Sequence, residues 1–273
     1  MGLLPSEKTQ PQTDPTKLSM LLYARSKFGK SEFCSKIPGA IFLATEPGLS
    51  HLETYNVPIP DWETFLAACG ELAGGNHPFK VVIVDTIDIC YKLCSQHVCA
   101  KHHVETESDL AYGRGHALVS NEFQRVLLKL ASQKFGLVLI SHSTEKEIEG
   151  RTGKYLKVVP TLPEKAAKFL LGLVDLICFG DFEIVTGPDG QKHFRRVLRT
   201  KPTIYYDAGD RSGRLPEMID LDFATFYEAY KQALGSKKPS ASRDSEQQST
   251  AAASIPSNST TATQSKERTE NKK

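Results

Sequence analysis

Short runs of apolar residues recur along the chain and are separated by longer polar or amphipathic stretches. Four runs stand out, at 18–23 (LSMLLY), 40–44 (AIFLA), 81–85 (VVIVD) and 137–141 (LVLIS). Each run is nearly continuous rather than alternating, which is typical of strands that are buried on both faces. The pattern therefore predicts a mainly parallel β-sheet that is flanked by helices.

Helical periodicity fills the intervals between these runs. It is clearest at 123–133 and 164–174, with further examples at 62–72 and 223–234. Strands and helices in alternation predict an α/β core, in which ligands bind at the carboxyl ends of the strands. Segment 182–200 instead shows two extended stretches around a Pro-Asp-Gly turn, which predicts an antiparallel hairpin extension at one edge of the sheet.

Composition divides the chain into three parts. Residues 1–16 contain three prolines and little apolar pattern, and residues 235–273 have one isoleucine as their only large apolar side chain. Neither segment can offset the entropy of ordering, so we expect a flexible N-terminal arm and a disordered C-terminal tail. One folded domain is expected between them, at 17–234.

Charge and cysteine content narrow the functional class. The net charge of the 273 residues is +2, which is too small for an overall nucleic-acid footprint, so any basic surface has to be local. No apolar stretch is long enough to span a membrane and no signal-peptide pattern is present, so we expect a cytoplasmic protein. The six cysteines are expected to be free thiols. A zinc site at Cys90, Cys94 and His97 is the alternative to a buried helix face, and we favour the buried face because Cys-x-x-Cys spacing is missing.

A glycine-containing loop follows the first apolar run directly. Residues 24–31 (ARSKFGKS) match the Walker A pattern Gly-x-x-x-x-Gly-Lys-Ser, except that Ala24 replaces its first glycine. Backbone amides of such a loop converge on phosphate oxygens, Lys30 reaches the β- and γ-phosphates, and the Ser31 hydroxyl binds magnesium. The pattern therefore predicts ATP and Mg²⁺ as ligands. The expected nucleotide-site residues are Ala24, Arg25, Ser26, Lys27, Phe28, Gly29, Lys30, Ser31 and Glu32.

Asp85, at the end of the third run, has the position of a Walker B carboxylate. Such a carboxylate holds a magnesium-bound water molecule opposite Ser31. A role as a helix cap is the alternative for Asp85. The order of the two motifs argues against a chance Gly-Lys-Ser sequence on a surface turn.

Further polar residues follow the apolar runs. Thr86, rather than a glutamate, comes after Asp85, so we expect the carboxylate base at Glu46, just beyond the second run, with Asp88 in reserve. Asp88 is more naturally a surface or capping residue, and Glu46 is alternatively a solvated loop residue. His142 follows the fourth run and can sense the γ-phosphate at the same sheet edge, or it can serve as a loop or capping histidine.

Taken together, these motifs resemble the RecA-like P-loop ATPases. The chain is more closely similar to the phage nucleotide-binding P-loop protein family, which is allied to phage single-strand annealing recombinases. The residues that carry the resemblance are YARSKFGKS, FLATEPG, VVIVDT, AYGRGHALVSNEF, LVLISHS, RTKP and DRSGRLP. The resemblance implies a RecA-like core that hydrolyses ATP, in which Glu46 matches the catalytic glutamate. It also implies a role in phage or prophage DNA recombination, annealing or replication, in the cytoplasm of a bacterial host.

The resemblance also implies a homo-oligomer, because RecA-like ATPases complete their sites with a cation from a neighbouring subunit. Late basic residues suit that role, namely Arg195, Arg196, Arg199, Lys201, Arg211 and Arg214. Lys201 and Arg211 are preferred because they lie within the resembling segments. Segment 146–157 is basic, and Tyr155 can stack on a base, so we expect a contact with single-stranded DNA, with a mobile lid or a plain hairpin as alternatives. The C-terminal tail could tether another replication or recombination protein.

Two other functions fit the same motifs. A kinase of a nucleoside or another small molecule also pairs a Walker A loop with a parallel sheet, although no compelling arginine-bearing lid motif is apparent. A non-hydrolysing ATP-binding regulator is the other alternative, because Ala24 departs from the glycine of the pattern. Phosphate release from ATP, measured with and without single-stranded DNA, distinguishes the three.

Overall fold

The computed structural model describes residues 7–8, 12–151, 153–188 and 190–235 of the chain. The helices are the short 3₁₀ turns η1 (Pro15–Lys17), η2 (Glu107–Asp109) and η3 (Ala111–Gly113), and the α-helices α1 (Lys30–Ser35), α2 (Trp62–Gly74), α3 (Ile87–Lys101), α4 (Arg114–Ala131), α5 (Glu164–Leu173) and α6 (Phe223–Gly235). The strands are β1 (Ser19–Ala24), β2 (Ala40–Ala44), β3 (Tyr55–Pro58), β4 (Val81–Asp85), β5 (Gly136–Gly150), β6 (Gly153–Pro160), β7 (Leu176–Thr186), β8 (Lys192–Arg199), β9 (Gly209–Asp210) and β10 (Met218–Asp220). Most of the expected arm and the expected tail beyond Gly235 lie outside the described residues.

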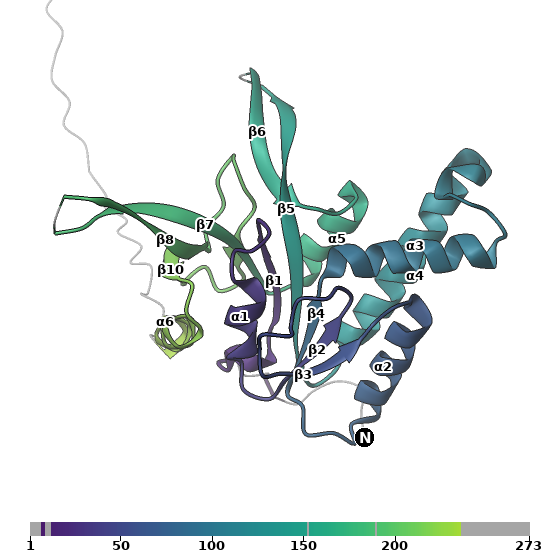
Figure 1. Ribbon diagram of the computed structural model, residues 1–273, viewed down its shortest axis with the longest axis horizontal. Coiled ribbons are helices and arrows are strands. Elements are labelled where there is room, and N and C mark those ends of the chain that lie inside the picture. Colours follow the sequence, from purple (N-terminus) through teal and green to yellow (C-terminus); the bar gives the residue numbers. More distant parts are fainter. Residues whose placement is uncertain (1–6, 9–11, 152, 189, 236–273) are drawn as a thin grey trace, which may run out of the picture. The chain divides into compact units, whose positions relative to one another are not determined.

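A single sheet of ten strands forms the centre of the part of the chain that the structure describes (Figure 1). The strand order is β10-β8-β7-β1-β5-β4-β2-β3, with β6 paired to β5 and β9 paired to β7. The pairs among β7, β1, β5, β4, β2 and β3 are parallel, whereas β6, β8, β9 and β10 pair antiparallel to their neighbours. The predicted fold class, a mainly parallel sheet with an antiparallel extension at one edge, is confirmed.

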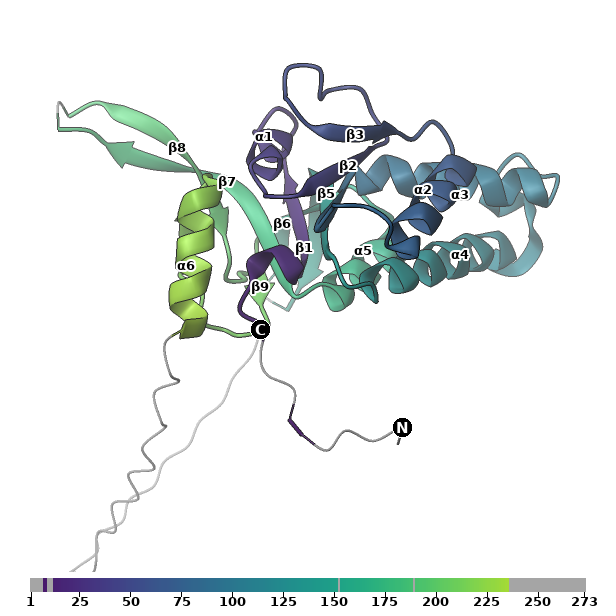
Figure 2. The same ribbon diagram turned by 90° about the horizontal axis from the view of Figure 1, so that it is seen from below.

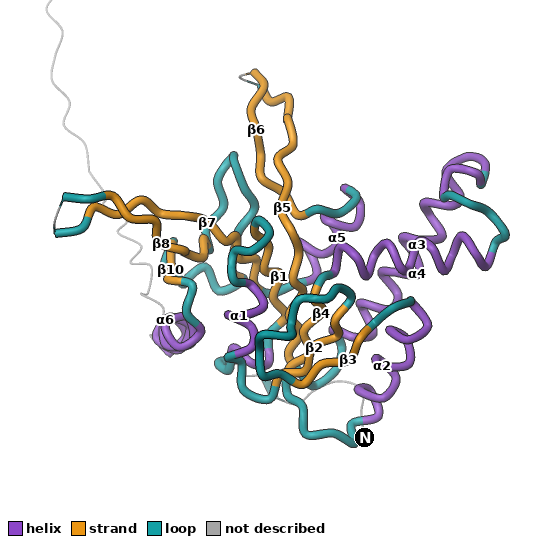
Figure 3. Tube along the Cα trace, viewed as in Figure 1, coloured by secondary structure: helices purple, strands orange, loops and turns teal. Residues whose placement is uncertain are grey.

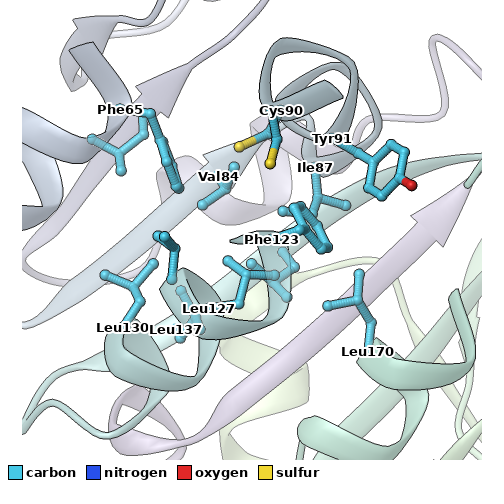
Figure 4. Packing of buried hydrophobic residues seen from close by; sticks show 14 of the residues in the cluster. Phe65, Val84, Ile87, Cys90, Tyr91, Phe123, Leu127, Leu130, Leu137 and Leu170 are labelled. Carbon is cyan, nitrogen blue, oxygen red and sulfur yellow. The ribbon is translucent and has the colours of Figure 1, made fainter. Parts of the chain in front are cut away.

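Helices cover both faces of this sheet, as Figure 2 shows from below. The larger apolar cluster joins α2, α3, α4 and α5 to one face, and the second cluster joins α1 and α6 to the other. Figure 4 shows how the larger cluster packs around Phe123 and Cys90. Cys90 and Cys94 are fully buried in that cluster, which favours the buried-face interpretation. Among the described residues, no group of three or more histidine, cysteine, aspartate or glutamate side chains is placed to hold a metal ion.

The helix boundaries follow local signals in the sequence. Helix α2 begins after Asp61, whose side chain accepts a hydrogen bond from the backbone N–H of Thr64 at 2.7 Å. It ends at Gly74 and is capped by Gly75, which has φ 73°. Helix α4 begins nine residues before the predicted segment 123–133, at Arg114. Its first turns lie against η2, where Gly115 packs directly on the carbonyl of Glu107. No helix in the described part of the chain is long and apolar enough to cross a membrane.

Two hairpins extend beyond the sheet, as the strand colouring of Figure 3 makes clear. One is formed by β5 and β6, because β5 leaves the core after Ser141 and continues to Gly150. The other is formed by β7 and β8, in agreement with the extended segments expected at 182–200. The hairpins begin with β5 and β7, and both of these strands pair with β1.

Candidate functional site

The site residues expected after the apolar runs lie together at the carboxyl ends of neighbouring strands. In the register of the sheet, Ala24 at the end of β1 is opposite His142 on β5, and Asp85 at the end of β4 is opposite Ala44, two residues before Glu46. A cavity of about 590 Å³ opens at this edge. Its lining consists of residues 26–32, residues 46–49, His51, Asp85, Thr86, His142 and Arg196.

The loop between β1 and α1 turns sharply at Gly29. This residue has φ 104°, in the region that favours glycine, and its carbonyl accepts the first helical hydrogen bond from the N–H of Phe33 at 2.9 Å. Lys27 also has a positive φ, of 60°. Between them Phe28 is buried, and its ring meets Phe182 of β7 edge to face with 5.3 Å between centroids. The side chain of Phe28 therefore holds the loop against β7.

Lys30 lies in the first turn of α1 with its ammonium group folded back onto the loop. Its Nζ donates to the carbonyls of Ala24 at 3.1 Å and Arg25 at 3.0 Å. Burial lowers the pKa of Lys30 below its usual value, and the charges of nearby carboxylates, Asp85 first among them, oppose that shift. A buried ammonium group that is bonded only to neutral groups favours a bound anion, because an anion would compensate its lost hydration.

Ser31 and Asp85 place a hydroxyl and a carboxylate side by side next to Lys30. The hydroxyl of Ser31 donates to Oδ2 of Asp85 at 2.7 Å. Burial raises the pKa of Asp85 above its usual value, and the hydrogen bond from Ser31 opposes the rise. A hydroxyl and a carboxylate are the hard oxygen ligands that magnesium takes in nucleotide sites, where phosphates and water complete its shell. The two residues therefore fit a magnesium ion, which would relieve the desolvation of the carboxylate.

Glu46 and His142 are joined in a chain of polar contacts across the cavity. Oε1 of Glu46 accepts a hydrogen bond from the hydroxyl of Thr86 at 2.6 Å and lies 3.3 Å from Nε2 of His142. Nδ1 of His142 lies 3.3 Å from Nζ of Lys30 and 3.1 Å from the hydroxyl of Ser26, which are both donors. All these contacts are satisfied when Nε2 carries the ring proton. Thr86 has no carboxylate and cannot act as a base, and its hydroxyl instead holds Glu46, the expected base, in place.

Asp88 differs from its sequence interpretation as a surface or capping residue. The side chain is buried, and it accepts hydrogen bonds from the hydroxyl of Ser141 at 2.5 Å and from the backbone N–H of His142 at 2.7 Å. It thereby ties the first turn of α3 to β5 at the point where that strand leaves the core. This contact fixes the backbone of His142, and we assign Asp88 a positioning role rather than that of a base.

Replacing Asp88 with asparagine is expected to remove a pH dependence of stability. Burial raises the pKa of Asp88 from 3.8 to about 6, and the hydrogen bonds from Ser141 and His142 oppose the rise. The folded protein thus holds this proton more tightly than the unfolded chain, so stability falls by up to about 3 kcal/mol as pH rises from about 4 to about 6, and then stays level. Urea unfolding across this pH range, without nucleotide or magnesium, measures the effect. Identical pH profiles for the two proteins would contradict it.

Ala24, the departure from the Walker A glycine, is matched by a glycine on the neighbouring strand. Ala24 belongs to β1, is fully buried, and follows Tyr23, which pairs with Phe179 of β7. The next residue of β7 is Gly180, where an added Cβ would lie 2.7 Å from the Cβ of Ala24 and would overlap the ring of Phe28. The methyl group of Ala24 therefore occupies space that Gly180 leaves open, and it points into the protein rather than into the cavity.

Replacing Gly180 with alanine is expected to displace the loop. The new methyl group has to push away Phe28 or Ala24, and such overpacking costs about 1–3 kcal/mol of stability. We expect the affinity for ATP to fall at least about tenfold if that cost is paid by the loop. Gly172→Ala is the control, because a Cβ there meets nothing within 4 Å. Calorimetric titration with ATP checks the prediction, which fails if both variants bind like the unaltered protein.

Arg211 lies far from the cavity within a single chain. Its Nε is 3.0 Å from Oδ1 of Asp175, and the other oxygen of that carboxylate accepts from the backbone N–H of Ser19 at 3.1 Å. Ser19 begins β1, whereas the loop that carries Lys30 follows the end of β1. Arg211 is therefore at the opposite edge of the sheet.

Lys201, the other expected interface cation, is also paired within the chain. Its Nζ donates to Oδ2 of Asp210 at 3.0 Å, and it is absent from the described lining of the cavity. The structure thus brings neither Lys201 nor Arg211 to Lys30 inside one chain. Their action across a subunit interface stays a prediction.

The segment that forms the cavity and nine of the ten strands also matches a known family. Residues 16–212 match the family model described as an AAA domain. This match begins in η1 and ends just after β9, so it contains all the expected site residues from Ala24 to Arg211. No curated protein shows a significant match to the chain.

Proposed function

Because the chain belongs to the AAA domain family, a family of nucleotide-binding ATPases, we propose that it binds ATP with magnesium in this cavity and hydrolyses it to ADP and phosphate. One observation carries the proposal. A buried lysine, a serine–aspartate pair of oxygen ligands and a glutamate held by hydrogen bonds converge on one cavity, as Lys30, Ser31 with Asp85, and Glu46. These are the groups that phosphoryl transfer to water needs.

Binding of the triphosphate follows from the loop and Lys30. The helix α1 begins at Lys30, and the backbone N–H groups at its start favour an anion. Nζ of Lys30 exchanges the carbonyls of Ala24 and Arg25 for oxygens of the β- and γ-phosphates. Ser31 and Asp85 would hold a magnesium ion, which supplies charge neutralisation at the phosphate oxygens when bound.

Hydrolysis requires a water molecule that attacks the γ-phosphorus. Glu46 lies on the cavity wall and takes the proton of this water as the new P–O bond forms and the oxygen of ADP leaves. Thr86 and His142 both contact Oε1 of Glu46, and these contacts hold the carboxylate on the cavity wall. His142 also contacts Lys30, so it links the base to the group that binds the γ-phosphate.

The β5–β6 hairpin is the DNA-contacting element in this proposal. Directly opposed residues of an antiparallel pair share a face. One face carries lysine, isoleucine and tyrosine, in the pairs Lys146–Lys157 and Ile148–Tyr155. The two lysines are ion-paired at their outer ends, Lys146 with Glu164 at 2.9 Å and Lys157 with Asp207 at 2.8 Å, so DNA phosphates would have to compete with these carboxylates. The other face carries three glutamates and one lysine, namely Glu145, Glu147, Glu149 and Lys154. A face with cations and an aromatic ring suits single-stranded DNA, whereas the acidic face repels it.

Strand β5 connects this hairpin to the nucleotide. His142 lies on the same strand, four residues before Lys146. Together with the sequence resemblance, this continuity supports an ATPase that acts on single-stranded DNA in phage or prophage recombination, annealing or replication. The proposal includes assembly into a homo-oligomer, in which Lys201 or Arg211 completes a neighbouring site.

Single-stranded DNA is expected to raise the rate of phosphate release from ATP. Tyr155→Ala should weaken DNA binding about tenfold, because stacking on one base contributes about 1–3 kcal/mol. Leu156→Ala is the matched control, since Leu156 is the next residue and is exposed on the acidic face, whereas Tyr155 is half-buried beside Tyr205. Equal DNA affinity in the two variants would remove the hairpin face from the proposal.

The same assay distinguishes the alternative functions. Transfer of phosphate to a nucleoside without any response to DNA would support a small-molecule kinase. Tight binding of ATP without phosphate release would support a regulator. The place of Ala24 against Gly180 weakens the case for the regulator, because the alanine methyl points away from the cavity.

A further inference from the structure

The β7–β8 hairpin contacts the phosphate loop through one of its faces. Phe182 and Arg196 are directly opposed in this antiparallel pair, so they share a face with Gly180. Phe182 meets the ring of Phe28, and Cζ of Arg25 lies 5.5 Å from the centroid of the Phe182 ring. The hairpin therefore packs against the loop on one side of β1, whereas Asp85 and His142 lie on the other side of β1.

Arg196 extends from the hairpin to the part of the loop formed by Phe28 and Gly29. Its Nη1 donates to the carbonyl of Phe28 at 3.0 Å, and it would lie 2.5 Å from any Cβ added to Gly29. Gly29 thus has a second reason to be glycine, beyond its φ of 104°. A side chain at this position would push the guanidinium group away from the loop.

The guanidinium group of Arg196 has unused hydrogen-bonding capacity on the cavity side. The side chain is 46% exposed and lines the cavity, and its nearest carboxylate, Glu32, is 3.9 Å away. Apart from the bond to Phe28, none of its donors has a hydrogen-bond partner in the described part of the chain. The planar fork of a guanidinium matches two phosphate oxygens at once.

Two neighbouring arginines of β8 form ion pairs away from the cavity. Arg199 pairs with Asp181 and Glu183, and Arg195 lies 3.2 Å from Asp220 on the opposite face of the hairpin. Of the six late cations considered from the sequence, Arg196 is the one found in the lining of the cavity within the described residues. It is therefore the cation that the fold itself supplies to the loop.

We propose that Arg196 is a phosphate-binding residue of the nucleotide site and contacts the α- and β-phosphates from the β7–β8 hairpin. This inference rests on the proposed binding of ATP. The phosphates next to Gly29 and Glu32 are reached from the β8 side, whereas Glu46 and His142 face the γ-phosphate from the other side of β1. Contacts with the α- and β-phosphates are present before and during hydrolysis alike. Arg196 therefore contributes to the affinity for ADP and ATP, and not to the turnover of bound ATP.

The test compares nucleotide binding and turnover in matched variants of the whole chain. We expect Arg196→Ala to weaken Mg-ADP and Mg-ATP about 10- to 100-fold each, as for loss of a hydrogen bond to a charged group, with kcat at saturating ATP changed less than about threefold. Arg195→Ala is the control, because it removes the same side chain from the next position, with 42% exposure, on the opposite face. The control should bind both nucleotides within about twofold of the unaltered protein.

Two further variants separate phosphate binding from a support of the loop. Arg196→Lys keeps the charge, whereas Arg196→Gln keeps an N–H donor for the carbonyl of Phe28 without the charge. We expect Lys to recover part of the affinity and Gln to behave like Ala. Recovery by Gln, affinity equal to that of the Arg195→Ala control, or a fall of kcat with unchanged ADP affinity would each overturn the role of Arg196. A lack of nucleotide binding by the unaltered chain would overturn both proposals, whereas binding that depends on Lys30 but not on Arg196 overturns this one alone.

Discussion

Replacement of Lys30 by alanine is expected to lower ATP turnover about 100- to 1000-fold, the usual effect of removing one group that stabilises transition-state charge. The ammonium group is buried, is bonded to the carbonyls of Ala24 and Arg25, and is the cation of the loop that lies beside Asp85. Within the described residues, the one other lysine in the lining of the cavity is Lys27, which is exposed. Phosphate release measured at saturating ATP checks the expected loss.

The matched control for this variant is Lys36→Ala. Lys36 follows the last residue of α1 and is exposed, so the same side chain is removed one helix length away from the cavity. Thermal unfolding of both variants shows whether they keep the fold. Turnover by the Lys30 variant that equals turnover by the Lys36 variant would exclude the loop as the phosphate site.

Replacement of Glu46 by glutamine is expected to stop hydrolysis while ATP remains bound. Glutamine keeps the oxygen that accepts the hydrogen bond from Thr86, so the side chain retains its place, but it cannot take a proton from water. Loss of a general base lowers turnover about 100- to 10,000-fold. Equilibrium binding of ATP should change little, and this separation of binding from turnover distinguishes Glu46 from Lys30.

Glu53→Gln provides the control for the glutamate prediction. Glu53 is an exposed residue of the same connection between β2 and β3, and it does not contribute to the described lining of the cavity. Its replacement should leave turnover unaltered. Should the Glu46 and Glu53 variants hydrolyse ATP equally fast, the base would have to be sought elsewhere in the molecule.

The sheet and the edge that carries the site were predictable because apolar runs and polar residues alternate in a fixed order. Asp85 ends one apolar run, and Glu46 and His142 follow two others. Each of these runs forms a buried parallel strand, and parallel strands end at the same edge of a sheet. Their proximity therefore follows from sequence pattern alone. The contacts that connect them, such as the bond from Thr86 to Glu46, depend on side-chain directions that the pattern does not contain.

The burial of Asp88 and the length of β5 are two local features that the sequence pattern did not predict correctly. Aspartate at position 88 suggests a helix cap or a surface residue, yet packing of α3 against β5 buries it among Ser141 and the backbone of His142. The continuation of β5 to Gly150 was predicted only through the alternative of a plain hairpin at 146–157, because residues 142–150 are mostly polar. In both cases tertiary context outweighs the local preference.

Partners from distant strands were beyond the reach of the sequence. The hydrogen bond from Arg196 to the carbonyl of Phe28 joins residues 168 positions apart. The space that Gly180 leaves for Ala24 depends on the pairing of β1 with β7. Register between strands that are far apart in sequence is set by the whole sheet, so neither contact has a local signature.

Strand β1 lies between β5 and β7, and each of these neighbours runs on into one of the projecting hairpins. Adjacent strands are about 4.8 Å apart, so the two hairpins leave the sheet at roots about 10 Å from each other, on either side of the loop. Two molecules bound to the two hairpins would therefore lie on either side of one nucleotide site. A change in the loop on hydrolysis would then reach both bound molecules through the strands next to β1, and no other part of the fold would have to move.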